Sequence, residues 1–338
     1  MAYGVARRRQ LQYGFEAVAG TAIAGDTLLP ADATEVNMIQ DTREVVIVPV
    51  GDGSLVTPDT VMYIPQELGT LTLPSHPFGF DLGNHFFQWG IDAEAATVDT
   101  GAGATAYIWQ YTIGAATNVP KSATFYGGDN NAAERGNYGI GSSFTLAGEN
   151  AAALMIGGEV FLRNVEADSF AALTAASNDI ALMGNAKLYI NDVSSAFGTT
   201  QLSGTFHSFN LDVTDTGYRG VKVGDGGLYY TAIKNVGPLA TLGVTFEYDA
   251  NVTTERVDWR AKTPRAVQIK VEGPAVAVAG DNYTYKTLII NFSGVWTEWG
   301  LLENDDGDDI MTGTLTMVDN ATMTYGCRII CVNELTSV

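Results

Sequence analysis

Few residues of types that commonly carry out catalysis occur in this chain, and their spacing forms no familiar catalytic pattern. There are three histidines, His76, His85 and His207, and no pair has the His-Glu-x-x-His spacing that places two imidazoles around zinc. Cys327 and Cys331 lack a second Cys or His pair to complete a tetrahedral zinc site. Residues four apart in a strand lie about 13 Å apart, which is too far for a disulfide. Two buried free thiols are therefore expected.

Motifs for phosphate, ester and nucleotide chemistry are also missing from the sequence. Neither Gly-x-Ser-x-Gly nor Gly-Lys-Ser/Thr occurs, and Gly101–Ala106 lacks the β-α-β context of a dinucleotide site. The acidic run Glu303–Asp309 suggests calcium, but aligning Gly307 with the sixth residue of an EF-hand loop puts Leu302 and Gly313 where carboxylates are required. A solvated acidic turn is expected there, with an irregular cation site as the alternative.

A carbohydrate site is the remaining catalytic or binding alternative. Trp296 and Trp299 could stack on a sugar, although packing near a strand end explains their spacing equally simply. Choosing two glycosidase carboxylates among 38 acids would be arbitrary. We therefore expect no catalytic residues, no bound cofactor and no metal, and so no enzyme.

The surrounding sequence predicts an all-β fold with one or two short helices. Aromatic and β-branched residues recur in short bursts among 38 glycines, whereas helical periodicity is scarce. A short helix is expected within Pro77–Trp89, and a weaker helix or a linker within Ala167–Ala176. Strands are expected at 44–50, 61–64, 70–73, 106–113, 122–126, 142–146, 158–162, 187–190, 204–213, 227–232, 242–248, 266–271, 287–292, 313–318 and 323–332.

At 338 residues the chain can form two domains. A change to small polar residues after the Ala-rich piece places the boundary near there. We expect an N-terminal arm (1–30), a first β domain (31–175) and a second β domain (176–338). An internal repeat is suggested faintly by Gly69–Leu73 against 204–206 and by Ser143–Leu146 against Val244–Phe246.

Charge is strongly negative and uneven. The net charge is -20, and no basic face suited to nucleic-acid binding is visible. Neither Lys nor Arg occurs within 44–120 or within 287–327, and both stretches are rich in acids. If part of each stretch lines one surface, that surface repels polyanions. The candidate residues are Glu44, Asp52, Asp59, Glu67, Asp81, Asp92, Asp99, Glu298, Glu303, Asp305, Asp306, Asp308 and Asp309.

Targeting signals are not expected. The start carries Arg7, Arg8 and Arg9, but the following residues supply no apolar region of a signal peptide. No apolar run near 20 residues could span a bilayer, so no membrane anchor is expected. These features indicate synthesis in the cytoplasm.

Several passages resemble the major tail tube proteins of long-tailed, siphovirus-type bacteriophages, in their larger two-domain version. The opening Arg8–Ala22 is similar to the N-terminal arm of that family through Gly14, Glu16, Gly20, Thr21 and Ala22. The succession Ser122–Asp129, Gly139–Ala147 and Gly158–Phe161 resembles the family's run of strands and glycine turns. The tail Asp306–Asn333 resembles its closing hairpin.

This resemblance implies a tail-tube-type β-sandwich or barrel, with two tandem tube domains. Inner sheets of neighbouring subunits would join around a lumen, which would pair their exposed edges. An acidic lumen would let DNA slide, since each phosphate on the duplex is negatively charged. Length and the faint repeat favour a ring of three subunits over a ring of six.

The resemblance also implies the partners and the location. The protein would bind itself in stacked rings, together with the tape measure protein and the tail terminator and distal tail proteins, while genomic DNA passes through non-specifically. It would be assembled in the host cytoplasm and reside in the virion. Another tail, baseplate or decoration β-sandwich is the alternative, followed by a carbohydrate-binding β protein. Candidate contacts between rings are Arg7, Arg8, Arg9, Tyr13, Phe15 and Glu16.

Overall fold

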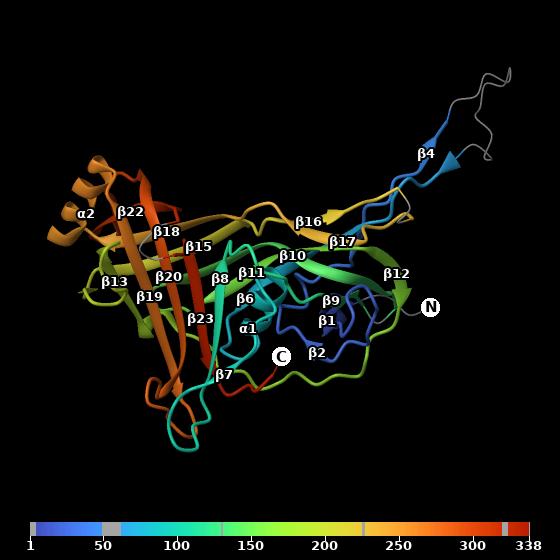
Figure 1. Cartoon of the computed structure of the whole chain (residues 1–338), viewed down its shortest axis with the longest axis horizontal. Coiled ribbons are helices and arrows are strands. Elements are labelled where there is room, and N and C mark those ends of the chain that lie inside the picture. The colour runs from blue at the N-terminus through green and yellow to red at the C-terminus, as the bar shows by residue number, and fades with distance from the viewer. Residues whose placement is uncertain (1–4, 49–61, 130, 225–226, 320–323, 338) are drawn as a thin grey trace.

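The computed structural model describes residues 5–48, 62–129, 131–224, 227–319 and 324–337. Strands dominate these ranges, in which only two α-helices occur, α1 (Gly83–Gly90) and α2 (Ala250–Ala261). This confirms the expected all-β class with one or two short helices. Figure 1 shows an elongated body with hairpins that project from one end.

The first part of the chain forms two antiparallel sheets that share one long strand, β10. In β10, residues 133–139 pair with β9 and residues 133–137 with β12, whereas residues 140–147 pair with β11. From β9 the first sheet continues to β1 and β2, and from β11 the second continues to β6 and β3. The bounds are β1 (Gln10–Phe15), β2 (Thr27–Leu28), β3 (Gln40–Asp41), β6 (Gly69–Pro77), β9 (Ala123–Gly128), β10 (Ala133–Glu149), β11 (Met155–Leu162) and β12 (Asn164–Asp168).

The second part repeats this arrangement around another long strand, β20. Residues 287–292 of β20 pair with β23 and residues 294–299 with β22, while β19 pairs along the opposite edge. From β19 one sheet continues to β13 and β14, and from β22 the other continues to β18 and β15. The bounds are β13 (Ala186–Asp192), β14 (Gln201–Leu202), β15 (Phe206–Asp215), β18 (Leu239–Glu247), β19 (Pro264–Ala275), β20 (Tyr285–Trp299), β22 (Asp308–Met317) and β23 (Cys327–Asn333).

The two parts therefore have the same pairing pattern, strand for strand. Each also places its helix directly after the corresponding strand, α1 after β6 and α2 after β18. When the two parts are aligned by their strand pairing, the pair Leu71–Val160 corresponds to the pair Leu242–Leu315. The similarities suspected between short sequence runs were wrong in detail, because Gly69–Leu73 corresponds to 240–244 and not to 204–206.

Two strand pairings join the parts. Phe144 to Glu149 of β10 pair with Val213 to Ser208 of β15, and β8 (Tyr107–Ile113) pairs with β23. The expected boundary at 175 and 176 falls between the two patterns, and the division into separate domains stays a prediction. Strand β1, within the expected arm, pairs with β9 along its whole length.

A continuous apolar core runs through both parts, from Leu11 to Cys331. All eight residues of α1 are buried, and Phe87 and Trp89 pack on Phe144 and Phe125. The short helix expected within Pro77–Trp89 is present as α1, which begins at Gly83 because the chain at Phe78 is still hydrogen-bonded to Leu154 as an extended segment.

Most expected strands are present, with three kinds of difference. Of the strand expected at 227–232, residues 227–231 are not strand, and β17 (Ala232–Asn235) begins only at its last residue. After Asp168, residues 169–176 have no helix. Within 44–48 only β4 (Val46–Ile47) is strand, while 49–50, 61 and 323 lie outside the described residues. Helix α2 was not predicted.

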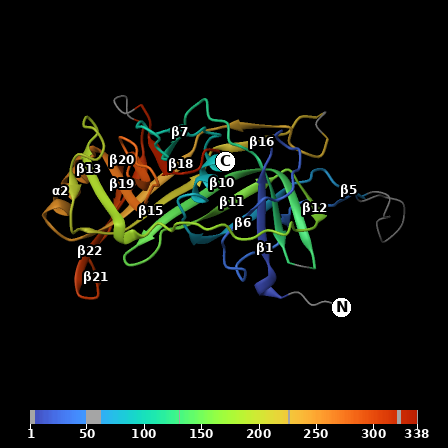
Figure 2. The ribbon, with the colours of Figure 1, turned by 90° about the horizontal axis from the view of Figure 1, so that it is seen from below.

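Two hairpins project from corresponding connections. The link from β3 to β6 carries β4 and β5 (Met62–Tyr63), and the link from β15 to β18 carries β16 (Tyr218–Val221) and β17. Both extend toward the same end of the molecule in two perpendicular views (Figures 1 and 2). Neither α1 nor α2, the helices of the described ranges, has the length and apolar character needed to cross a membrane.

Candidate functional site: a polar sheet face without lysine or arginine

One large sheet runs across both parts of the chain. Its strand order is β3, β6, β11, β10, β15, β18, β22 and β20, joined in the middle by the β10–β15 pairing. The alternation in β6 explains its two faces, because Leu71 and Leu73 are buried while Thr70 and Thr72 are exposed. The apolar side covers the core. The opposite side is open to solvent except near Phe161, where the β16–β17 connection packs through Tyr230 and brings Arg219 and Lys222 beside Thr70.

The open side, which we call the polar face, carries mostly hydroxyl groups. Cross-strand neighbours on it are matched by register, for example Thr145 with Asp212, and Asp212 with Thr241. Thr145 Oγ1 donates to Asp212 Oδ1 at 3.3 Å, and Thr245 and Thr312 share a hydrogen bond of 2.9 Å. The polar face includes Thr70, Thr72, Ser143, Thr145, Glu159, Ser208, Asn210, Asp212, Thr241, Thr245, Thr297, Glu298, Thr312, Thr314 and Thr316.

The charge on these strands has one sign. Strands β6, β11, β15, β18 and β22, with residues 140–149 of β10 and 294–299 of β20, contain no Lys or Arg. Glu159 and Asp212 lie on the polar face, and Glu247 lies at the end of β18, 2.9 Å from His207 Nε2. A phosphate backbone would meet hydroxyl groups and carboxylates on this surface, and no fixed cation in its strands.

Among the described residues, none of the candidate acids of the first base-free stretch belongs to a strand of the large sheet. Asp81 forms an ion pair with Lys286 at 3.0 Å, and Asp99 is 2% exposed and accepts the Tyr283 N–H. Asp92 accepts the Val119 N–H at 2.8 Å. These three carboxylates are occupied within the chain. Of the rest, Glu44 is exposed, Glu67 lies 3.7 Å from Arg43, and Asp52 and Asp59 lie outside the described residues.

The second stretch is gathered at one place. Glu298 is exposed on β20, and the acidic run forms the tip of the hairpin between β21 (Glu303–Asp305) and β22. Asp306 and Gly307 have positive φ angles of 51° and 103°, which make the turn. No group of three or more His, Cys, Asp or Glu side chains placed to hold a metal occurs in the described part of the chain. The exposed members are Glu303, Asp305, Asp306, Asp308 and Asp309.

The base-free stretches include one acid of the polar face, Glu298, which lies opposite Thr314, but they do not include Glu159 and Asp212, which also lie there. A usable signal was present in the alternation of each strand. Threonine occupies the polar phase in Thr70–Thr72 and Thr312–Thr316, and acids in that same phase belong to the same side of the sheet.

The candidate contacts between rings divide into exposed and buried residues. Arg7 and Arg8 are exposed, and Arg9 donates to the Val36 carbonyl at 3.1 Å. Tyr13 is fully buried, with its hydroxyl 2.8 Å from His85 Nδ1. Phe15 is half-buried and packs on His85 and Trp89. Tyr13 therefore acts within the fold of one chain.

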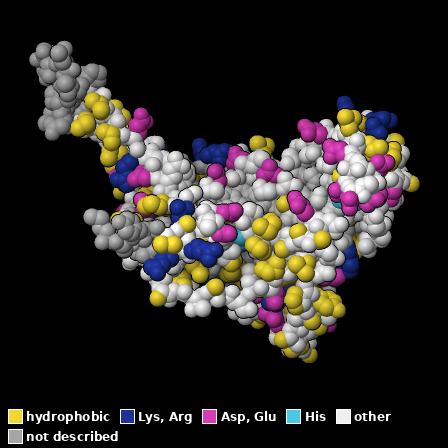
Figure 3. Space-filling view, turned by 180° about the vertical axis from the view of Figure 1, so that it is seen from behind, with side chains coloured by type: hydrophobic (Ala, Val, Ile, Leu, Met, Phe, Trp, Pro, Cys, Tyr) yellow, Lys and Arg dark blue, Asp and Glu magenta, His cyan; other side chains and the backbone are white. Residues whose placement is uncertain are grey.

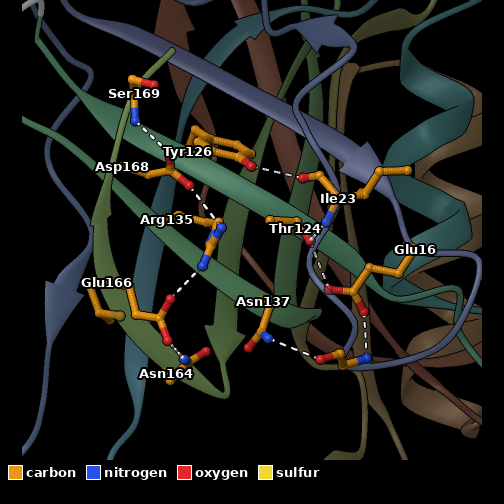
Figure 4. Close-up of polar contacts among 12 residues, drawn as sticks. Glu16, Ile23, Thr124, Tyr126, Arg135, Asn137, Asn164, Glu166, Asp168 and Ser169 are labelled. Carbon is orange, nitrogen blue, oxygen red and sulfur yellow. Dashed lines mark hydrogen bonds and ion pairs between the residues drawn. The ribbon is translucent and has the colours of Figure 1, made fainter. Parts of the chain in front are cut away.

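Glu16 likewise acts within the fold, as the centre of a buried polar network (Figure 4). Its carboxylate accepts four hydrogen bonds, from Ser122 Oγ at 2.8 Å, Thr124 Oγ1 at 2.9 Å, and the N–H groups of Gly20 at 2.7 Å and Tyr138 at 2.8 Å. Charged acceptors with several donors are well satisfied when buried. Glu16 thus fixes the loop after β1 onto β9 and β10.

A second set of polar contacts in Figure 4 ties β10 to β12. Arg135 of β10 bridges Glu166 and Asp168 of β12, the latter at 2.8 Å. Asn137 of β10 donates to the Gly20 carbonyl, in the loop after β1, at 3.0 Å. These contacts are structural. The thiols of Cys327 and Cys331 are free and buried as expected, and burial raises their pKa, which keeps them unreactive.

Comparison with known proteins adds no relative to this description. A scan of the sequence against protein-family models found no match, and a search of curated proteins found no significant similarity.

Proposed function

We propose that this protein is the major tail tube protein of a siphovirus-type bacteriophage. Rings of the protein would stack into the tail tube, and the polar face would line the channel through which the genome is ejected. The observation that carries the proposal is the twice-repeated sandwich, whose two polar half-sheets join edge to edge through β10 and β15. A ring needs that same joint between copies.

The width of such a ring is compatible with the cargo. Each chain contributes the eight strands of the large sheet, so three chains at about 4.8 Å per strand give a wall about 115 Å around and about 37 Å across. Side chains about 5 Å long leave roughly 27 Å, and strand tilt would widen the ring further. Duplex DNA, whose two groove depths add to about 16 Å, has room to pass. This estimate favours three two-part subunits.

The surface chemistry suits passage without binding. A basic wall would hold the duplex through many phosphate contacts, whereas a wall of hydroxyl groups and carboxylates repels it. In this role the protein would reside in the virion after assembly in the host cytoplasm. Its partners would be its own copies, the tape measure protein, and the terminator and distal tail proteins.

Electron microscopy of the purified protein tests the proposal. We expect rings and stacked tubes, with three-fold symmetry in averaged end-on views. A single ring that never stacks would instead favour a baseplate or decoration role. A chain that stays monomeric in sedimentation at all concentrations, and forms no ring, would overturn the proposed function.

A further inference from the structure

The joint between the two parts of the chain gives a template for a contact between copies. In β10, residues 144–147 have a neighbour on both edges, β11 on one and β15 on the other. Leu146 in this stretch is fully buried. Strand β15 is correspondingly long, because it also has two neighbours, β10 and β18.

The corresponding stretch in the second part begins at the end of β20. Both strands have a bulge at the same place, after Gly141 in β10 and after Trp296 in β20. Both then place an aromatic residue opposite a glycine, Phe144 opposite Gly158 and Trp299 opposite Gly313. Trp299 therefore corresponds to Phe144, and Gly300 to Thr145.

This end of β20 has an open edge in the described chain. Residues 296–299 pair with β22 on one side, and the β19 pairing stops at Val295. The Gly300 N–H donates to the Thr312 carbonyl, and the next pair on the same side is Glu303 with Ile310. The two residues between Gly300 and Glu303 are therefore opposite a single residue, Met311. These two, Leu301 and Leu302, are 82% and 49% exposed, although Leu146 at the corresponding place in β10 is buried. Within the described residues, no other segment buries these two leucines at the edge of β20.

The other end of the sheet also lacks a neighbour among the described residues. Strand β3 corresponds to β15, but it pairs only with β6 and is two residues long. Its register on β6 equates Gln40 with Asp212 and Asp41 with Val213. Met38, just before it, is 47% exposed.

The two projecting hairpins differ in the same manner, because one packs against the chain and the corresponding one does not. The β16–β17 connection packs back on the first part, where Tyr230 is buried against Tyr138 and Phe161 at 5.1 and 5.7 Å between ring centroids. The corresponding β4–β5 hairpin stands free, and Figure 3 shows apolar side chains along it. Its exposed apolar residues are Val45, Ile47, Val48, Met62 and Tyr63.

We propose that β3 of one copy pairs antiparallel with the open edge of β20 of a second copy, with Gln40 opposite Gly300 and Asp41 opposite Trp299. This register copies the in-chain pairs Thr145–Asp212 and Phe144–Val213. The edge-to-edge pairing covers Leu301 and Leu302 and extends the large sheet from copy to copy. The inference rests on the proposed self-assembly and adds the strands and the register of the contact.

Cysteine crosslinking tests the register. Gln40→Cys combined with Gly300→Cys should crosslink between copies with a short thiol-to-thiol reagent, since paired cross-strand Cβ atoms lie about 5 Å apart. Thr145→Cys with Asp212→Cys is the positive control and should crosslink within one chain. Asp41→Cys with Gly300→Cys is the matched negative control, because a slip of one residue places the two side chains on opposite faces.

The outcomes separate this inference from the proposed function. Covalent multimers from the first pair, with few from the slipped pair, support the register. Rings that form while the first pair crosslinks no better than the slipped pair overturn the register and leave the proposed tube intact. A protein that forms no assembly, while the in-chain control still crosslinks, overturns both.

A second variant tests the edge without cysteines. Leu301→Asn should reduce ring formation at least tenfold and leave the unfolding midpoint of the dissociated chain unchanged, since the side chain is largely exposed there. Val119→Asn, at a residue 68% exposed in another loop, is the matched control and should assemble normally. Equal assembly of both variants would contradict the docking edge.

Discussion

His85 lies inside the molecule among aromatic rings. Its Nδ1 is 2.8 Å from the Tyr13 hydroxyl, and its ring centroid lies 5.3 Å from that of Phe15. Burial, helped by the charge of Lys121, lowers the pKa of His85 to about 3. The imidazole therefore stays neutral at the pH values where an exposed histidine becomes charged. This residue supports the fold and takes no part in the polar face.

This depressed pKa predicts loss of stability in acid. Below pH 6.5 the unfolded chain binds a proton at position 85 and the folded chain does not, so the free energy of unfolding decreases as the pH falls from 6.5 toward 3. The expected slope from this residue is about 1.4 kcal/mol per pH unit. Burial lowers the pKa of His76 too, and adds to the effect. Urea denaturation from pH 7.5 to 4.5 measures the slope.

Variants of two histidines identify which residue causes the pH dependence of stability. His85→Gln should reduce the pH slope, whereas His207→Gln, which changes a histidine beside Glu247 near the surface, should retain it. An unchanged slope in His85→Gln would show that other groups cause the acid sensitivity.

At the scale of elements, α2 shows what strand-centred sequence reasoning leaves out. Asp249 caps the helix by accepting the N–H groups of Asn251 and Val252. The helix is polar on most sides and buries only Val252 and Glu255, so no clear apolar stripe marked it. Its position is set by contacts to β19 and β20, which a reading of local sequence does not contain.

Glu255 anchors α2 to the sheet. Its carboxylate accepts from Arg265 at 3.0 and 2.5 Å and from Trp296 Nε1 at 3.1 Å. Burial raises the pKa of Glu255, and Arg265 opposes that rise. Glu255→Ala leaves Arg265 without its closest partner and should lower the free energy of unfolding by about 3–5 kcal/mol. Chemical denaturation measures the loss.

A neighbouring position on α2 controls for helix propensity. Thr254→Ala, at an exposed site one residue earlier, should change stability by no more than about 0.5 kcal/mol. If Glu255→Ala costs as little as this control, the helix is held by other contacts.

At the scale of the whole molecule, the duplication is visible in pairing and almost invisible in sequence. Phe144 and Trp299 occupy corresponding places, as do Val160 and Leu315, so residue identity changes while the buried phase persists. The all-β class and most strands could be predicted, because alternation and glycine turns are local features. Strand partners come from distant parts of the chain, so the true repeat register could not be deduced. Alternation could place Glu159 and Asp212 on the solvent side of their own strands, but not on one shared face.

The charge of the polar face is expected to control whether duplex DNA binds to the assembled protein. Glu159→Lys with Asp212→Lys reverses two charges on that face, and tubes of this variant should bind duplex DNA at low salt and release it as salt increases. Tubes of the unchanged protein should bind little DNA at any salt. Asp192→Lys with Asp281→Lys makes the same charge change at exposed positions elsewhere and should bind less than the first variant. Fluorescence anisotropy of a short labelled duplex, with tube integrity checked by microscopy, measures both. Equal binding by the two variants would mean that total charge, and not the polar face, governs contact with DNA.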